Sequence, residues 1–517
     1  MTAVAAVDGE RTLGPRQLMA FIGMALGMFL AVLNIQIVGS SFDDIQAGLA
    51  AGPDEISWIL TASLIAEVII IPMSGWLSRL FSTRWLFTTC TLGFCAASVA
   101  AASAWSIESM IMFRATQGLF GGAMAPMVFS TVYAAFPVRH QNNLIAIVSV
   151  LGTGAVALGP SLGGWITETL SWHWLFLFNV PFGLLSAALV FTLVDFDRPD
   201  WSLGKKIDLP GIILIAVFFM CLLIVLEEGR REDWLASPMI RTLAVVTVVA
   251  GVLLVWRELS CAHPVVDLRV FANRNFAVGA FYIMVFGAGL FVPLYLLPLF
   301  LGRIIGLNTF QIGTWLFVLG LSMMAAGIVM PTLLRYFRRR TVAFAGFALL
   351  AFGTWLQADL SAHTDFVQLL APQLIRGFAT QLCFLSMMGL AIGLLPVDQV
   401  KNGTALFQLC MRLGAAVAVA IANSYLVIRA QTHYQGFRER VPEGDPFTGN
   451  IGGLFGRTFE PLFGGSPDAH VASVQVLTAM IQRESLILAF NEITVVFAAG
   501  IALSLLAMPL VKSVRKT

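Results

Sequence analysis

Two adjoining stretches, GAVALGPSLGG at residues 154–164 and WHWLFLFNVPFG at residues 172–183, decide the fold. Small residues that recur at every fourth position leave two neighbouring stripes of a helix almost bare, so that the backbone of another helix can approach closely. The two stripes comprise Gly152, Val156, Pro160 and Gly164, and Ala155, Gly159 and Gly163. Pro160 lacks a backbone N–H and is expected to bend the helix. A bare, bent helix suits either a sliding seam between moving parts or tight packing in any multispanning membrane protein.

The same run contains the pattern G-x-S-x-G at residues 159–163, which marks the nucleophilic serine of some hydrolases. That motif requires a strand, a sharp turn and then a helix. Ser161 instead lies in a long, mostly apolar run without a turn. There is also no G-x-x-x-x-G-K-[ST] loop that would bind the phosphates of ATP. We therefore expect a protein that is not an enzyme.

The composition indicates an integral membrane protein. Of the 517 residues 58% are hydrophobic and only 12% are charged, whereas about 25% are charged in soluble domains. The mean hydropathy is +0.85. The net charge of +2 is too small to indicate binding to nucleic acid.

Counting apolar runs long enough to cross about 30 Å of hydrocarbon predicts fourteen spans. They lie near residues 17–39, 57–77, 84–103, 107–133, 143–167, 171–194, 208–226, 239–257, 275–299, 309–334, 341–360, 366–395, 404–430 and 487–511. An even number of spans places both termini on one side of the membrane. Most of the basic residues, including every lysine, fall on that side. The positive-inside rule therefore predicts that both termini are cytoplasmic.

Internal spacing indicates a duplication. Pro72 and Pro331, Pro137 and Pro396, and Arg114 and Arg376 are each about 260 positions apart. We expect two six-helix bundles with two additional helices between them. The predicted domains are a cytoplasmic tail (1–16), an N-terminal bundle (17–200), two extra helices (201–262), a C-terminal bundle (263–511) and a second cytoplasmic tail (512–517). The C-terminal bundle includes an extracytoplasmic loop, 431–486, which we expect to be partly ordered.

One carboxyl group is predicted near the middle of the membrane. Glu67 lies about 15 Å into the second span, where an ionisable group costs at least about 2.5 kcal/mol on insertion scales. A carboxyl group at this depth is neutral in the absence of water, and it ionises when water or a cation reaches it. Glu67 is thus a candidate site for proton coupling or for recognition of cations. The alternative is a neutral glutamic acid that is hydrogen-bonded between helices.

Two arginines are also predicted at membrane depth. Arg114 and Arg412 each have a glutamine nearby on the same helix face, Gln117 and Gln408 respectively. A guanidinium group cannot lose its charge, so each must face a cavity or a carboxylate. Glu492 lies only a few residues inside the last span and is a weaker candidate. No histidine is predicted in mid-span, so we expect no histidine relay, metal site or cofactor.

With these residues assembled, the chain resembles the major facilitator superfamily, and within it the fourteen-span drug:proton antiporters of the EmrB/QacA type. The resemblance covers about residues 17–511. It rests on GAVALGPSLGG, MIMFRATQGLFGG and WHWLFLFNVPFG, with support from KIDLPG at 206–211, HPVVDLRVFANRNF at 263–276, MRLG at 411–414 and FNE at 490–492. The FNE run and the long loop before it are most similar to the EmrB branch.

The sequence departs from that family in two places. The first span of the family reads L-D-x-T, but residues 33–36 are Leu-Asn-Ile-Gln, so Asn34 and Gln36 replace the acid and the hydroxyl. Glu67 is therefore the main candidate for the proton-coupling site. The loop after the second span keeps Gly75 and Arg84 but has Arg79 where many members have aspartate. That loop acts in the family as a conformational latch, which Arg79 could serve only with a different partner.

The resemblance implies an exporter that works by alternating access. Proton coupling is assigned to Glu67 and Glu492, and substrate binding to a set that comprises Asn34, Gln36, Glu67, Arg114, Gln117, Gln408 and Arg412. The residues assigned to conformational change are Gly75, Arg79, Arg84, Gly154, Gly159, Pro160, Gly163 and Gly164. Because arginines outnumber the central carboxylate, we expect hydrophobic substrates that are anionic or weakly acidic. Phe113, Phe120, Phe129, Phe384 and Phe407 are candidate cavity residues.

The EmrB resemblance further implies a bacterial inner-membrane component of a three-part efflux pump. Its partners would be a periplasmic adaptor of the EmrA type and an outer-membrane channel of the TolC type. Two alternatives remain open at this stage: an exporter dedicated to one metabolite, such as a siderophore or an aromatic acid, and a membrane sensor or scaffold that transports nothing.

Overall fold

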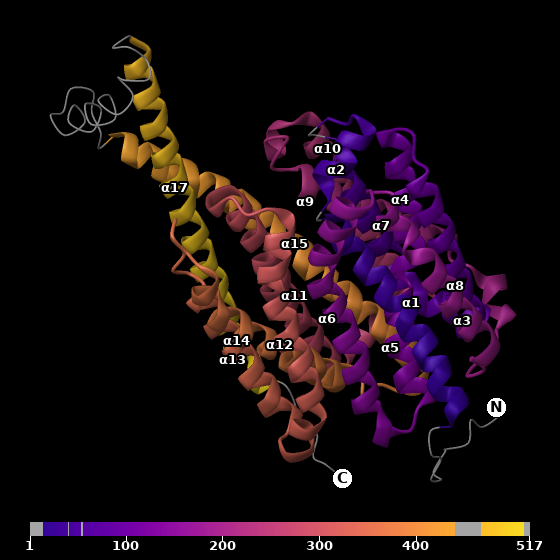
Figure 1. Ribbon diagram of the computed structural model, residues 1–517. Coiled ribbons are helices and arrows are strands. Elements are labelled where there is room, and N and C mark those ends of the chain that lie inside the picture. Colours follow the sequence, from indigo (N-terminus) through magenta and orange to yellow (C-terminus); the bar gives the residue numbers. More distant parts are fainter. Residues whose placement is uncertain (1–13, 40, 53–54, 440–466, 511–517) are drawn as a thin grey trace.

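The computed structural model describes residues 14–39, 41–52, 55–439 and 467–510, and no strand occurs among them (Figure 1). The helices of the first half are α1 (Pro15–Gly39), α2 (Phe42–Leu49), α3 (Trp58–Ala102), α4 (Ile107–Gly122), α5 (Met124–Ala135), α6 (Val138–Thr169), α7 (Trp174–Leu177) and α8 (Asn179–Leu193). Two helices follow, α9 (Leu209–Glu228) and α10 (Pro238–Ser260). Those of the second half are α11 (Arg274–Phe300), α12 (Thr309–Tyr336), α13 (Arg339–Leu356), α14 (Phe366–Ala391), α15 (Val397–Glu439) and α17 (Pro467–Ser504).

Eleven helices of the described chain are long and apolar enough to cross a membrane, or twelve when the bent α6 is counted as one span. Helix α3 counts once in this total but contains two spans. It has 45 residues, and its backbone leaves the helical conformation at Ser82. Ser63 packs on Gly118 of α4 and Phe94 packs on Gly121, less than one turn away. In a straight helix Ser63 and Phe94 would be about 47 Å apart, so the chain turns back at Ser82.

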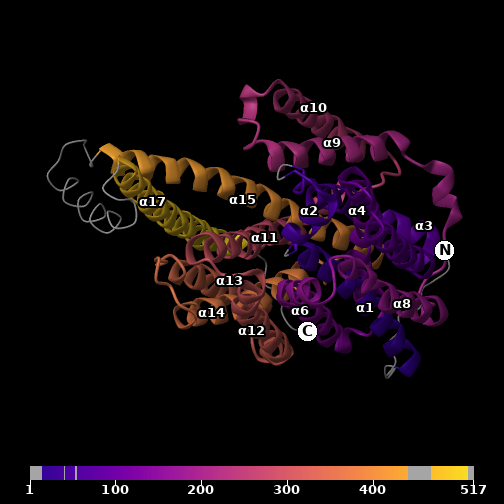
Figure 2. The ribbon, with the colours of Figure 1, turned by 45° about the horizontal axis from the view of Figure 1, so that its top comes forward.

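With α3 taken as two spans and α13 added, the structure is compatible with the fourteen predicted spans. Helices α1 to α8 gather in one bundle and α11 to α17 in another, as the two colour ranges of Figures 1 and 2 show. Helices α9 and α10 lie at the edge of the molecule, where α9 contacts both α3 and α15 (Figure 2). Only 17% of the most apolar part of α10 is buried, as expected for a helix that faces lipid.

The two bundles contact each other where α6 packs on α12 and α14, and where α3 and α5 pack on α15. Helix α6 packs on α12, where an added Cβ at Gly313 would lie 2.7 Å from the backbone nitrogen of Ser161. Helix α3 packs on α15, where an added Cβ at Gly75 would lie 2.8 Å from the carbonyl oxygen of Lys401. Both distances are below van der Waals contact, so these two crossings require glycine.

The C-terminal half contains a long helical hairpin where a partly ordered loop, residues 431–486, is predicted. Helix α15 continues to Glu439 and α17 begins at Pro467, and these two helices extend beyond the other helices in Figure 1. The 43 residues of α15 span about 65 Å, twice the thickness of the hydrocarbon. The predicted loop is therefore helical at both ends, while residues 440–466 lie outside the described part of the chain.

Candidate functional site

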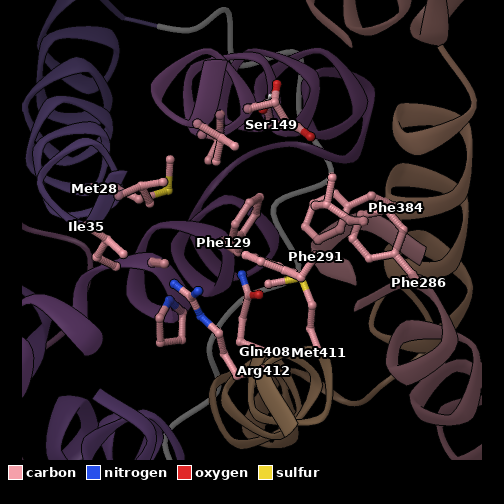
Figure 3. A pocket seen from close by; sticks show the side chains of 18 of the residues that line it. Met28, Ile35, Phe129, Ser149, Phe286, Phe291, Phe384, Gln408, Met411 and Arg412 are labelled. Carbon is pink, nitrogen blue, oxygen red and sulfur yellow. Dashed lines mark hydrogen bonds between the residues drawn. The ribbon is translucent and has the colours of Figure 1, made fainter. Parts of the chain in front are cut away.

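A cavity lies between the two bundles, with about 870 Å³ of empty space including the part that is open to solvent. The first bundle contributes residues of α1, α3, α4, α5 and α6, and the second contributes residues of α11, α14 and α15. The lining residues named in Figure 3 are Met28, Ile35, Phe129, Ser149, Phe286, Phe291, Phe384, Gln408, Met411 and Arg412. We call this space the central cavity.

The wall of the central cavity is mostly apolar and rich in aromatic rings. The rings of Phe129 and Phe384, one from each bundle, have centroids 5.6 Å apart, and Phe286 lies 5.6 Å from Phe384 (Figure 3). Of the five predicted phenylalanines, Phe129 and Phe384 line this cavity, and Phe113, Phe120 and Phe407 line neither it nor the smaller cavity described below. A wall of this kind offers a ligand apolar contact area, with only a few polar groups to orient it.

The central cavity contains an ion pair that joins the bundles. Nη2 of Arg412 on α15 donates to Oε1 of Glu67 on α3 over 2.6 Å, and the two side chains are 15% and 10% exposed. The guanidinium group of Arg412 also lies over the ring of Phe291, 5.7 Å from its centroid. Breaking such a poorly solvated pair by removal of one charge costs about 3–5 kcal/mol.

Small residues on α4 place Glu67 beside this cavity. An added Cβ at Gly122 would lie 2.8 Å from Cγ of Glu67, and one at Gly118 would lie 2.2 Å from the carbonyl oxygen of Ser63. Both glycines belong to the run MFRATQGLFGG. The absence of side chains at these positions lets α3 and α4 meet backbone to backbone, which places Glu67 and Arg114 on the same side of the bundle.

A second, smaller cavity of about 380 Å³ shares Glu67 and Arg412 with the first. Arg114, which is only 1% exposed, lines it. Nη1 of Arg114 donates to Oδ1 of Asn34 over 2.5 Å and also to Oε1 of Gln117. Its Nε and Nη2 atoms are buried without a hydrogen-bond partner. Nε2 of Gln117 in turn donates to Oγ of Ser98 over 2.7 Å.

All the predicted substrate-binding residues line these two cavities. Gln36, Glu67, Gln408 and Arg412 line the central cavity. Asn34, Arg114 and Gln117 line the smaller cavity together with Glu67 and Arg412. Asn34, at the position of the missing acid, is 1% exposed and is a hydrogen-bond partner of Arg114. An amide at this position orients the guanidinium group without neutralising its charge.

Two charged groups from the sequence analysis lie outside both cavities. Arg376 is buried in the second bundle, and its Nη1 donates to Oε1 of Gln357. Glu492 lies on α17, where it accepts from Nε and Nη2 of Arg429 over 2.6 and 2.9 Å and lies 3.0 Å from Nε2 of His433. The ion pair of Glu492 therefore ties α17 to α15 at some distance from Glu67, and the coupling role of Glu492 remains a prediction.

The glycine-rich helix α6 is bent by 42° between Val156 and Leu158. The missing N–H of Pro160 leaves the carbonyl of Val156 without its helical partner. Within this motif Gly159 makes the closest contact, because an added Cβ there would lie 2.3 Å from Cβ of Gln36. An added Cβ at Gly154 or Gly164 would meet nothing closer than 3.8 and 3.5 Å respectively. Gly163 is buried, and its carbonyl accepts from the hydroxyl of Thr167 over 3.0 Å.

The turn after Gly75 is joined to the second bundle by Lys401 rather than by an arginine of its own. Nζ of Lys401 forms an ion pair with Oδ2 of Asp197 and donates to the carbonyl of Ser78 over 3.1 Å. Asp197 also accepts from the backbone N–H and the hydroxyl of Thr83, over 3.0 and 2.8 Å. We call Thr83, Asp197 and Lys401 the ionic latch.

The two predicted arginines of this turn are placed differently. Arg84 stacks over Phe191, with its guanidinium carbon 4.6 Å from the ring centroid. The carbonyl of Arg79 accepts from the N–H of Asp200, and Nε of Arg79 is buried without a partner. Sequence reasoning missed Asp197 and Lys401, although both are charged residues at the ends of predicted spans.

Comparisons with known proteins agree with this architecture. A family model described as Major Facilitator Superfamily matches residues 24–419. The chain is 34% identical to the colistin resistance protein EmrB of Acinetobacter baumannii, with 92% of each chain covered. It is 28% identical to the multidrug export protein EmrB of Escherichia coli, with 96% of this chain and 95% of that protein covered. The proton:xylose symporter XylE has a similar fold, with a TM-score of 0.56 at 13% identity and 96% of both chains covered. The chain therefore belongs to the major facilitator superfamily and is a relative of the EmrB multidrug exporters.

Proposed function

We propose that this transporter is a proton-coupled exporter of hydrophobic compounds that works by alternating access. The observation that carries the proposal is the ion pair between Glu67 and Arg412, which joins the two bundles inside a cavity with a mostly apolar wall. A titratable carboxylate at the seam between two moving halves can link the charge state of the cavity to the movement. The EmrB relatives are named for multidrug export and colistin resistance, which supports the same function.

The ion pair supplies a rule for coupling. When Glu67 carries no proton and the cavity is empty, its attraction to Arg412 resists separation of the bundles. A proton on Glu67 removes that attraction. A bound substrate that separates Glu67 from Arg412 removes it as well. Either ligand therefore permits the conformational change and the empty protein does not, which is the requirement for exchange of a proton for a substrate.

We further propose that the protein lies in a bacterial inner membrane with both termini in the cytoplasm. The ionic latch would then hold the cytoplasmic end closed, and the hairpin of α15 and α17 would project into the periplasm. Helices that extend about 65 Å reach well beyond the membrane, where they could meet a periplasmic adaptor of the EmrA type and a channel of the TolC type. Residues 17–200 and 263–511 are our proposed boundaries for the two bundles.

Reconstitution into proteoliposomes tests the transport proposal. The neutral fluorescent dye N-phenylnaphthylamine serves as substrate, and its flux is measured with and without an imposed pH gradient. We expect accumulation against the dye gradient only when protons can flow in the opposite direction. Equal flux with and without the pH gradient would leave facilitated diffusion as the mechanism. No flux from correctly folded protein, together with no dye binding, would instead favour a sensor or scaffold.

A further inference from the structure

Three charged side chains line the two cavities, and their charges do not sum to zero. Arg114 and Arg412 carry two positive charges, and Glu67 supplies one negative charge. Among the residues that the structure describes, no further Asp or Glu lines either cavity. Only Arg412 is paired with Glu67, while Nε and Nη2 of Arg114 are buried without a partner. A charge without a partner in a poorly solvated site is costly, so the arrangement calls for an additional anion.

We propose that Glu67 exchanges partners between Arg412 and Arg114, and that the exchange frees Arg412 to bind the anionic head of an amphipathic monoanion. This inference rests on the proposed function and specifies its substrate class. Before the substrate binds, Glu67 would pair with Arg412, and this is the ion pair found in the structure. In the loaded protein the substrate carboxylate pairs with Arg412, and Glu67 pairs with Arg114.

The burial of the two arginines assigns these separate roles. Arg412 is 15% exposed, lies in the central cavity and stacks on Phe291. A ligand whose tail lies among the aromatic rings can therefore place its head on Arg412. Arg114 is 1% exposed and lines only the smaller cavity, which has less than half the volume of the central cavity. The tail is therefore assigned to the central cavity, whereas Glu67 on the adjoining helix α3 lines both cavities.

The hydrogen-bond geometry favours Arg114 as the waiting partner. Asn34 and Gln117 both accept from its Nη1, which fixes the plane of the guanidinium group and leaves its other nitrogens available. Arg114 and Glu67 belong to the same bundle, so this second pair can persist when α15 moves. The pair between Glu67 and Arg412 joins different bundles and is lost when they separate.

Charge balance explains why the substrate should be a monoanion. Two arginines and one carboxylate leave the empty site with one excess positive charge. A bound monoanion brings the site to neutrality with Glu67 still deprotonated, and every charge then has a partner. The loaded protein thus needs no proton, as antiport requires. A cation would add to the excess charge, and a neutral molecule would leave it in place.

The test compares binding of decanoate and decanol to the purified transporter by isothermal titration calorimetry in detergent, with empty micelles subtracted. The wild-type protein should bind decanoate more tightly than decanol by about tenfold or more, the usual contribution of one charge-assisted hydrogen bond. Arg412→Gln should remove this preference, because it should weaken decanoate binding much more than decanol binding. The control is Arg376→Gln, a buried arginine that lines neither cavity, and it should keep the preference.

Arg114→Gln gives the sharper result. Without Arg114, Glu67 must be protonated whenever decanoate occupies Arg412. Decanoate binding should therefore take up about one proton, measured in two buffers of different ionisation enthalpy, and should weaken as the pH rises. The wild-type protein should show no such uptake. The double variant Arg114→Gln/Glu67→Gln should restore binding that does not depend on pH, because no carboxylate is left to neutralise.

Each outcome has a defined consequence. If Arg114→Gln binds decanoate without proton uptake, or if Glu67→Gln fails to restore its binding, then Arg114 is not the second partner and the exchange is wrong. If the wild-type protein binds decanol but shows no preference for decanoate, the substrate class is wrong and the exporter proposal stands. If it binds neither ligand nor the neutral dye, the exporter proposal itself fails.

Discussion

Replacing single glycines of α6 with alanine should have opposite effects at two positions of the same helix. Gly159 and Gly154 are both buried. At Gly159 the new Cβ would lie 2.3 Å from Cβ of Gln36 and within 3.3 Å of its backbone carbons, whereas carbon atoms in contact are about 3.5–4.0 Å apart. At Gly154 the nearest atom is the flexible sulfur of Met324, at 3.8 Å.

The magnitudes follow from these contacts. Helices α6 and α1 must separate by more than about 1 Å to admit alanine at residue 159, and such overpacking costs about 1–3 kcal/mol. Alanine gains about 1 kcal/mol over glycine in a helix. Since backbone atoms of Gln36 cannot rotate away, we expect a net loss of up to about 2 kcal/mol for Gly159→Ala and a gain of up to about 1 kcal/mol for Gly154→Ala.

Thermal unfolding in detergent measures the difference. Gly159→Ala should lower the midpoint and Gly154→Ala should raise it or leave it unchanged. The clash is with Cβ of Gln36, and glycine at residue 36 itself costs about 1 kcal/mol in a helix. Gly159→Ala should therefore lower the midpoint less in a Gln36→Gly background than in the wild-type protein. A midpoint for Gly159→Ala at or above that of Gly154→Ala, or an equal loss in both backgrounds, would refute this explanation.

Three further predictions follow from other contacts. Asp197→Asn or Lys401→Gln breaks the ionic latch, in which the side chains of Asp197 and Lys401 are 23% and 15% exposed. We expect the equilibrium to shift about tenfold or more towards separation of the bundles at that end, measured as faster labelling of cysteines introduced beside Gly75. Unchanged labelling would show that the latch is not needed. Gly118→Ala places a Cβ 2.2 Å from the carbonyl oxygen of Ser63, so it should destabilise the protein by about 1–3 kcal/mol and weaken dye binding near Glu67. The control Gly500→Ala, whose added Cβ would have nothing within 4 Å, should have neither effect. A photocrosslinker at an exposed position of α17 near Gln475 should capture a periplasmic adaptor in cells that contain one, and the same probe on α10 should not. Equal capture at both sites would argue against the hairpin as the docking element.

Sequence reasoning predicts individual residues of the site better than it predicts their partners. Glu67 can be identified because a carboxylate in an apolar span is energetically expensive, and the structure places it in both cavities. Its partner Arg412 is 345 positions away, and no local pattern connects the two. The same holds for Lys401 and Asp197, which are 204 positions apart and belong to different bundles. Such pairs depend on how the two bundles pack against each other, and the spacing of residues along one helix carries no information about that packing.

The long hairpin shows a different limit. Residues 431–439 are polar and charged, and an apolar count therefore ends the span near residue 430. The helix continues to Glu439 because hydrophobicity marks the membrane boundary and not the end of hydrogen bonding along the backbone. The sequence also does not predict which aromatic side chains face the cavity. Phe129 and Phe384 line the central cavity, but Phe407 on a neighbouring helix is fully buried in packing.

The most direct test of the proposed coupling follows proton movement through the Glu67→Gln variant in sealed proteoliposomes. A pH-sensitive dye inside the vesicles reports protons while an outward substrate gradient drives exchange. The account predicts that the wild-type protein moves protons against the substrate, and that Glu67→Gln still exchanges labelled for unlabelled substrate but moves no protons. Proton movement by Glu67→Gln at the wild-type rate would contradict the claim that the pair of Glu67 and Arg412 couples the proton to the substrate.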